Sequence, residues 1–400
     1  MTARWVFDEG TPRHRSYQAI GWGLFLLVVI LVPFVFAETW APTVFGNKYT
    51  VSLGNIGHAV AWMVAILGLN MVVGYTGQLS LGHSFFVGSG AFMTAILVED
   101  FGWPFVATLV VVVPVTFVIG LLVGIPALRI QGLYLGLITF GLAAVFPSII
   151  KLDSLADRTG GSNGKNITSD LVPPDWLNLE GFAEFFQGLP VIGGLFGSGG
   201  LSRRQEEAVY KYFLLVLMAA VVFWLVRNLV HSRIGRAMLA LRDNPTGAAV
   251  SGVNLAAYKT LGFGLSAAVG GVAGMMYAAT IGFASADEFG STLAIFFLVG
   301  LIVGGPATLT GPIIGGLVII FVPVWAGQTE EVPGLGWDLN GPYGSLILGV
   351  MLIVLTFLLP GGVAYGLRRL RARFVQVVPA APTVRSGPAP GDMVAEPISS

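Results

Sequence analysis

Polar residues and glycines interrupt a long apolar region at residues 74–92, which read GYTGQLSLGHSFFVGSGAF. Their amide, hydroxyl and imidazole groups could contact a substrate, and the candidates are Gly74, Tyr75, Gln78, Ser80, Gly82 and His83. Transporters use broken helices with exposed N-termini to meet anionic substrate groups, and Ser80 is placed to cap the helix that follows. The stretch fits a substrate pathway and, equally well, a tight hairpin turn with close glycine packing.

Catalytic groups are otherwise scarce. No nucleophile–base pair or carboxylate pair is evident, there is no Cys, and the four His are scattered, so we expect neither an enzyme nor a metal site. Ion-driven carriers usually keep an ionisable group within an apolar span. In this chain every Asp and Glu lies outside the apolar stretches. Only His58 and His83 remain, and such residues are more typically hydrogen-bonded between helices. Residues 159–166 resemble a phosphate-binding loop but have Asn166 where Ser or Thr should ligate magnesium. The energy source is therefore predicted to be another polypeptide.

The composition defines the class of fold that must position these residues. Hydrophobic residues make up 55% of the chain and charged residues only 10%, and the mean hydropathy is +0.81. A soluble chain of 400 residues cannot cover its surface with so few charges. The apolar runs are continuous over about 20 residues, the length that crosses a bilayer. We therefore predict an all-α polytopic membrane protein.

About ten transmembrane helices are predicted. The first predicted span is too long for a cleavable signal peptide, and its length favours a signal anchor. Small-xxx-small glycine pairs recur along the spans and favour close helix packing, and Gly-Pro pairs after residue 304 predict a tight turn. The predicted spans are 19–37, 51–73, 79–98, 105–126, 131–150, 210–228, 259–283, 290–304, 309–327 and 343–360.

The charges predict the orientation. Lys and Arg gather at both termini, at Arg129 and in a central loop, whereas most Asp and Glu lie in the alternate loops, so both termini are expected in the cytoplasm. Residues 181–200 are apolar but rich in Gly, which favours a re-entrant or interfacial segment. The predicted parts are a cytoplasmic arm (1–18), a transmembrane domain (19–365) containing an external loop (151–210) and a cytoplasmic loop (229–258), and a basic then disordered cytoplasmic tail (366–400).

The cytoplasmic loop has a helical pattern of its own. Ile234, Met238 and Leu241 share one face, and Arg236 and Arg242 lie off it. Asn244-Pro245 ends this helix, and Thr246 is placed to cap a short second one. A basic loop that only fixes topology is the simpler interpretation, and a docking element for a soluble partner is the alternative.

Five ordered motifs carry a resemblance to a known family. They are residues 74–92, IQGLYLGLITFGL (130–142), TGGSNG (159–164), SRIGRAMLALRDNPTGAAVSGVNLAAYKTLGFGLSAAVGGVAGMMYA (232–278) and VGLIVGGPATLTGPIIGG (299–316). Over residues 50–365 the chain resembles the LivM-type permease of branched-chain amino-acid ABC importers. It departs at 303–307, where Val-Gly-Gly-Pro-Ala replaces the family's frequent Leu-Gly-Gly-x-Gly.

The resemblance implies an ABC importer permease bundle in the bacterial cytoplasmic (inner) membrane. The partners would be a second, LivH-like permease subunit, two ATP-binding subunits, a substrate-binding protein, the amino acid substrate and the lipid bilayer, with no nucleic acid. This chain would bind no cofactor, and ATP and Mg would belong to the ATPase subunits. The coupling residues carried over from the family motif are Arg236, Arg242, Asp243, Asn244, Ala248, Ala249 and Gly252.

Two alternatives remain open at this point. The permease subunit of a urea or short-amide ABC importer shares these motifs, and the residues do not distinguish the two substrates. A self-sufficient channel or ion-driven carrier belongs to another class. The lack of acidic groups within the spans disfavours the carrier, and the shaped cytoplasmic loop disfavours the simple pore.

Overall fold

A computed structural model describes most of the predicted spans. The described residues are 51–130, 132–167, 202–327 and 361–378, with short pieces at 5–8, 27, 29–33, 43–44, 47–48, 171, 173, 181, 349–350 and 353–354. Most of the predicted first and last spans, the 181–200 segment, the rest of the N-terminal arm and residues 379–400 lie outside this set.

The chain divides into two compact units, residues 1–29 with 368–400, and residues 30–367. In the first unit, β1 (Trp5–Asp8) pairs in parallel with β6 (Val375–Val378). Strand β6 includes the first residues of the tail that was predicted to be disordered. Helix α15 (Gly362–Phe374) contains the basic run before it.

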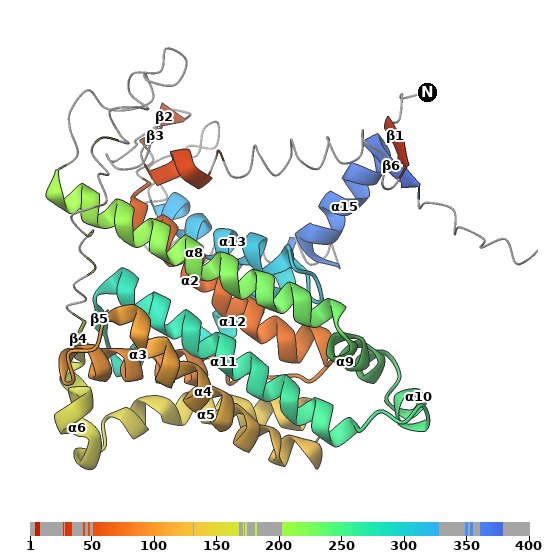
Figure 1. Ribbon diagram of the computed structural model, residues 1–400, viewed down its shortest axis with the longest axis horizontal. Coiled ribbons are helices and arrows are strands. Elements are labelled where there is room, and N and C mark those ends of the chain that lie inside the picture. The colour runs from red at the N-terminus through yellow and green to blue at the C-terminus, as the bar shows by residue number, and fades with distance from the viewer. Residues whose placement is uncertain are drawn as a thin grey trace, which may run out of the picture. The chain divides into compact units, whose positions relative to one another are not determined.

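The second unit is mostly helical (Figure 1). Its first elements are β2 (Thr43–Val44), β3 (Asn47–Lys48), α2 (Leu53–Asn70), the π-helix η1 (Met71–Tyr75), α3 (His83–Glu99), η2 (Phe105–Thr108), α4 (Leu109–Gly124), η3 (Pro126–Leu128), α5 (Leu133–Ile150), α6 (Asp153–Thr159), η4 (Gly161–Asn163) and β4 (Lys165–Asn166). After the undescribed stretch follow α8 (Arg203–His231), α9 (Arg233–Asp243), α10 (Pro245–Val250), α11 (Leu255–Ile281), β5 (Phe283–Ala284), η6 (Ala286–Phe289), α12 (Ser291–Gly304) and α13 (Gly311–Gly327).

Eight of the ten predicted spans correspond to apolar helices. Five are long enough to cross a membrane, namely Leu53–Tyr75, Phe105–Leu128, Leu133–Ile150, Arg203–His231 and Leu255–Ile281, and α3, α12 and α13 are shorter. The main difference is α8, which begins at Arg203 instead of near residue 210. Ser202 and Gln205 have the residue types of a capping box, and the Ser202 N–H donates to Gln205 Oε1 at 2.7 Å at this earlier start.

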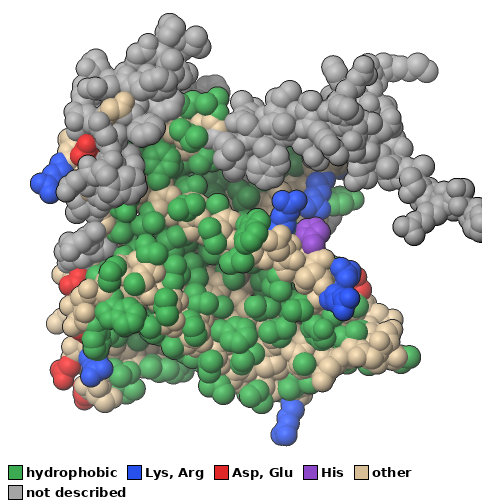
Figure 2. Space-filling view, in the orientation of Figure 1, with side chains coloured by type: hydrophobic (Ala, Val, Ile, Leu, Met, Phe, Trp, Pro, Cys, Tyr) green, Lys and Arg blue, Asp and Glu red, His purple; other side chains and the backbone are tan. Residues whose placement is uncertain are grey.

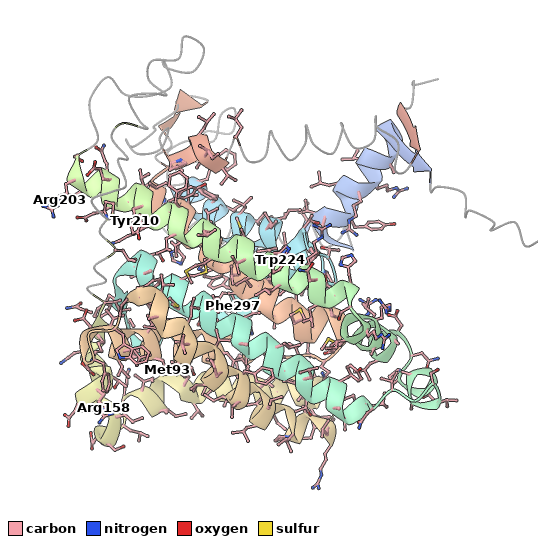
Figure 3. The ribbon with its side chains drawn as sticks, in the orientation of Figure 1. Met93, Arg158, Arg203, Tyr210, Trp224 and Phe297 are labelled. Atoms are coloured by element: carbon pink, nitrogen blue, oxygen red, sulfur yellow. The ribbon has the colours of Figure 1, made fainter. Side chains whose placement is uncertain are left out.

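Helices α2 and α11 form the centre of this unit. In both, 78% of the apolar window is buried, against 22% for α4, 28% for α8 and 33% for α5. Phe297 of α12 packs in this centre, whereas Trp224 of α8 is exposed (Figure 3). Large apolar side chains such as Val110, Leu133 and Leu217 are also exposed on the outer helices. Figure 2 shows hydrophobic side chains over the middle of the visible face and charges mainly at the helix ends, the distribution that a bilayer requires.

Glycines set the closest helix contacts. A Cβ on Gly90 of α3 would overlap the carbonyl of Gly271 in α11, and a Cβ on Gly304 would overlap that of Gly311. The small-xxx-small spacing predicted such backbone approach. Gly132 has a different role, because a Cβ at this position would meet open space. Its φ of 64° is the reason that glycine is required before α5.

The segment after α5 folds back onto one end of the bundle. Strand β4 pairs antiparallel with β5, Lys151 forms an ion pair with Asp287 at 2.7 Å, and Lys165 forms one with Asp100 at 2.6 Å. Lys165 is the lysine of residues 159–166, which resemble a phosphate-binding loop. The Asp100 carboxylate engages its ammonium. Helices α9 and α10 lie at the opposite end (Figure 1).

Candidate functional site

The central helix α2 breaks where the sequence indicated. It widens into the π-helix η1, the Gln78 N–H donates to the Val72 carbonyl at 3.0 Å, and residues 76–82 then run without helix to α3. π-Helical turns are frequent at functional sites. The predicted cap by Ser80 is wrong, because Gly82 occupies the N-cap position of α3 and no side chain caps it. The connection is longer than the link over residues 74–78 that the predicted spans implied, and Gly77 and Gly82 within it pack closely against neighbouring residues.

Asn70 fixes the geometry of the break. Its Nδ2 donates to the Thr308 carbonyl at 2.9 Å, and its Oδ1 accepts from the Ala307 N–H at 2.8 Å. Ala307 has a φ of 56°, unusual for a residue with a Cβ, so these bonds hold a strained turn between α12 and α13. Gly74 leaves room for them, because a Cβ there would overlap Asn70 Oδ1 and lie 2.6 Å from the Ala307 nitrogen. Sequence reasoning missed Asn70, although an amide within an apolar run was a signal.

Gln78 crosses from the break to α11. Its Nε2 donates to Thr76 Oγ1 at 2.9 Å and to the Lys259 carbonyl at 3.2 Å, and Thr76 Oγ1 donates to the Val72 carbonyl at 2.6 Å. The side chain is only 7% exposed, and its Oε1 has no hydrogen-bond partner among the described residues. A buried amide oxygen normally accepts a hydrogen bond, so this atom indicates a place for a donor from outside the described chain.

The remaining pathway candidates pack between helices. His83 lies against Gly68 of α2 and Gly270 of α11, and its Nδ1 is 3.4 Å from Ser266 Oγ. Gly82 fits against the Thr139 carbonyl, where a Cβ would come within 2.6 Å. Together with Ser80 and Tyr75, these residues are almost fully buried. They hold α3 against α2, α5 and α11 instead of surrounding a shared opening.

The loop at residues 229–258 forms the predicted helix–break–helix. Ser232 caps α9 by accepting from the Ile234 and Gly235 N–H groups, and Met238 and Leu241 are buried against the bundle. The second cap differs from the prediction, because Asn244 rather than Thr246 accepts from the Gly247 N–H at 2.9 Å. An Asn immediately before Pro at the first helical position is a strong start signal, and it leaves Thr246 inside α10.

Arg242 connects this loop to the helix break. Its Nη1 donates to the Gly74 carbonyl at 2.9 Å, and its Cγ lies against Gly77, where a Cβ would come within 2.7 Å. Asp243 accepts from Arg242 Nε at 2.9 Å and from Nη2 at 2.8 Å. Arg242 is exposed overall, as its predicted position off the packed face implies, but its stem and Nη1 reach the bundle. The two candidate sites meet at this residue.

The outer face of α9 and α10 is exposed. Among the described residues Arg236 donates to the His231 carbonyl alone, at 2.9 Å, and Ala249 and Gly252 are exposed. Val250 is 86% exposed, whereas Ala248 is buried at 5%. Gly252 has a φ of 83° and nothing within 4 Å of its Cβ position, so the backbone of this chain requires glycine there. Ala248 likewise packs within the chain, whereas Ala249 and Val250 are exposed apolar residues of α10.

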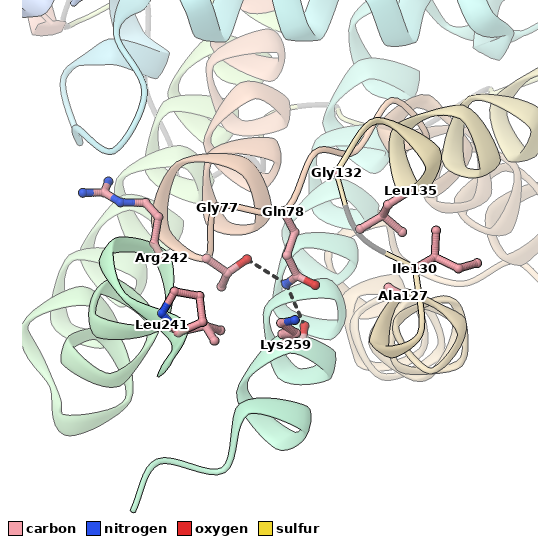
Figure 4. A pocket seen from close by; sticks show the side chains of 11 residues that line it. Gly77, Gln78, Ala127, Ile130, Gly132, Leu135, Leu241, Arg242 and Lys259 are labelled. Carbon is pink, nitrogen blue, oxygen red and sulfur yellow. Dashed lines mark hydrogen bonds between the residues drawn. The ribbon is translucent and has the colours of Figure 1, made fainter. Parts of the chain in front are cut away.

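A pocket of about 160 Å³ lies where α9, the helix break, η3 and α11 meet (Figure 4). Of the residues proposed from sequence, only Gln78 and Arg242 line it. The full lining is Thr76, Gly77, Gln78, Ala127, Ile130, Gly132, Leu135, Leu241, Arg242, Pro245 and Lys259.

Helices long enough to cross a bilayer, exposed apolar faces and a broken central helix define a polytopic α-helical membrane protein. Residues 53–356 match the family described as the branched-chain amino acid transport system / permease component, and the chain belongs to this family. It is similar to the high-affinity branched-chain amino acid transport system permease proteins LivM of Salmonella typhimurium (strain LT2) and Escherichia coli (strain K12). Each is 28% identical over 344 residues, which cover 85% of this chain and 74% of the relative. No solved structure matches the chain.

Proposed function

We propose that this chain is the membrane-spanning permease subunit of an ABC importer and forms part of the pathway for branched-chain amino acids. It would assemble with a second, LivH-like permease subunit, two ATP-binding subunits and a substrate-binding protein, in the bacterial inner membrane. The family and both LivM relatives support the amino acid substrate over urea or a short amide, because their names specify branched-chain amino acids.

The contact between Arg242 and Gly74 is the structural observation that carries the coupling part of this proposal. A loop that only fixed topology would need positive charge on α9 but no hydrogen bond to the centre of the bundle. Here the exposed face of α9 and α10 offers a docking surface, and the Arg242 side chain reaches the broken central helix at 2.9 Å. Movement of a docked ATPase subunit would therefore act on residues 71–78.

The proposal includes an orientation. The α9–α10 end would face the cytoplasm, and the end with β4 and β5 would face outward, as the charge distribution favours. The chain has no Cys, so single-cysteine variants label cleanly. A membrane-impermeant thiol reagent added to intact cells should label a cysteine at position 165 and not one at position 236. Labelling at 236 alone would overturn this orientation.

Transport by the reconstituted complex tests the function itself. Proteoliposomes containing this chain, the second permease subunit and the ATPase subunits should take up labelled L-leucine when the binding protein and ATP are supplied. This chain alone should neither hydrolyse ATP nor transport. Uptake of urea without leucine would establish the alternative importer, and uptake by this chain alone with an ion gradient would establish a carrier.

A further inference from the structure

Two residues that line the pocket between α9 and the helix break carry polar groups without a partner among the described residues. Gln78 Oε1 needs a donor, and in Figure 4 it points toward Ala127 and Ile130, on the side of the pocket opposite Arg242. The Lys259 ammonium has no acidic or hydrogen-bonding partner among the described residues, although Lys259 is half-buried. A ligand that satisfies both must carry a donor at one point and negative charge at another.

Thr76 and Arg242 are the other polar side chains of the lining, and most of the remaining residues are apolar. Ile130, Leu135 and Leu241 supply branched aliphatic walls, and Ala127 and Pro245 complete them. A volume of about 160 Å³ is close to that of an engineered protein cavity that admits benzene, and this pocket is partly open, so a slightly larger molecule can project from it. An ammonium group, a carboxylate and a short branched side chain match the three kinds of surface.

We propose that this pocket binds a free aliphatic α-amino acid from the cytoplasmic side and that its occupation slows import. The ammonium would donate to Gln78 Oε1, the carboxylate would pair with Lys259, and the side chain would pack on Ile130, Leu135 and Leu241. This inference rests on the proposed function, because the ligand is then the transported product. It adds a regulatory site separate from the substrate pathway.

The position of the pocket gives the reason for inhibition. Leu241 and Pro245 belong to the cytoplasmic loop, Gln78 to the helix break and Lys259 to the start of α11. A ligand in contact with all three holds them in one arrangement and opposes the relative movement of α9 and residues 71–78 that coupling requires. It binds the state seen here more tightly than any state with α9 displaced, which shifts the equilibrium toward the present state.

The experiment compares loaded with empty vesicles. Proteoliposomes of the full complex, with the α9–α10 face toward the lumen, contain ATP and either no amino acid or unlabelled L-leucine, and the initial uptake of labelled L-leucine is measured. The readout is the ratio of the two rates, so a variant's own basal rate cancels. We expect loading to reduce uptake. Lys259→Gln should raise the lumenal concentration needed for half-inhibition about tenfold, since it removes one charge-assisted contact.

Arg129→Gln is the matched control. It removes one cation at the same end of the bundle, and Arg129 is exposed and does not line the pocket, so half-inhibition should stay at the parent concentration. Two leucine analogues test the zwitterion directly. Loading with 4-methylpentanoate, which lacks the ammonium, or with 3-methylbutylamine, which lacks the carboxylate, should require about tenfold higher concentrations than leucine.

The outcomes separate this site from the function on which it rests. No leucine uptake into empty vesicles would refute the proposed function. Uptake into empty vesicles that loading does not slow would overturn the regulatory site alone. Equal inhibition by the carboxylate-only analogue, equal half-inhibition in Lys259→Gln and parent, or inhibition that depends on phosphatidylethanolamine in the vesicle instead of leucine would also overturn it. The last result would assign the pocket to a lipid headgroup.

Discussion

Replacing Arg242 by Met isolates the connection between the cytoplasmic loop and the broken helix. Met retains an unbranched stem of similar length, so contact with Gly77 is preserved while the hydrogen bond to the Gly74 carbonyl is lost. Helix α9 keeps its buried contacts through Met238 and Leu241. The variant should therefore insert, assemble and hydrolyse ATP, and its defect should appear in coupling.

The size of the defect follows from the exposure of Arg242. A hydrogen bond to a charged group contributes roughly 1.5–3 kcal/mol. The Arg242 side chain is 33% exposed and shares its guanidinium with Asp243, so solvent reduces the contribution of the Gly74 contact to about 1 kcal/mol. That free energy corresponds to about a fivefold change in an equilibrium constant. We expect the ratio of leucine transported to ATP hydrolysed to fall about fivefold.

The assay measures leucine uptake and ATP hydrolysis in the same proteoliposomes. Arg227→Met is the matched control, because Arg227 is an exposed cation near the C-terminal end of α8 and lies outside the docking face of α9 and α10. It removes the same charge and should leave the ratio unchanged. If Arg242→Met keeps the parent ratio, or if both variants lower it equally, the hydrogen bond to Gly74 does not transmit movement and the loop acts through its charge alone.

Three further predictions concern other parts of the chain. Gly74→Ala places a methyl group against Asn70 Oδ1 and should lower the free energy of unfolding by roughly 2–4 kcal/mol through overpacking and lost hydrogen bonds; an unchanged unfolding midpoint in detergent would contradict this. Val250→Asp puts a charge on the exposed docking face and should reduce co-purification of the ATPase subunits about tenfold, whereas Val250→Thr should not; equal recovery with both would exclude docking at α10. Partial burial raises the pKa of the Glu288 carboxyl, and the hydrogen bond from the Tyr277 hydroxyl lowers it by less, so this group stabilises the fold at low pH and the contribution is lost as pH rises through the raised pKa. Glu288→Gln, neutral throughout, should therefore unfold at a higher temperature than the parent at neutral pH and at the same temperature below about pH 4; a parallel shift at both pH values would refute the assignment.

Patterns along the chain predicted where the helices lie, but they predicted the contacts of single residues less well. Apolar runs of bilayer length located eight described helices. The helical spacing of Ile234, Met238 and Leu241 identified the packed face of α9. Both patterns arise from local spacing, which the helix geometry determines without knowledge of neighbours. The ten-span count and the orientation stay predictions, since most of the first and last spans lie outside the described residues.

The site itself depended on contacts between distant residues. Asn70 bonds to residues 307 and 308, and Arg242 bonds to Gly74, separations that no local pattern contains. Ser80 had the right residue type for a cap, but α3 begins at His83 because the Leu81 N–H is satisfied by Thr139 Oγ1 at 2.9 Å. Tertiary contact therefore overrode the local capping signal there. The positive φ of Gly252 gives a backbone reason for glycine that the sequence did not reveal, and its role in coupling stays a prediction.

Helix α11 begins three residues after Gly252 and ends next to β5, so it runs unbroken from one end of the bundle to the other. At 1.5 Å per residue its 27 residues form a rod of roughly 40 Å. A tilt of about 5° would displace one end relative to the other by roughly 3.5 Å, as geometry requires for a rod of this length. Because Gly271 brings the backbones of α11 and α3 into contact, α3 must follow that tilt. A push on α9 and α10 would therefore reach Asp287 and Lys151 at the opposite end as a rigid displacement, with no chain of side-chain rearrangements in between.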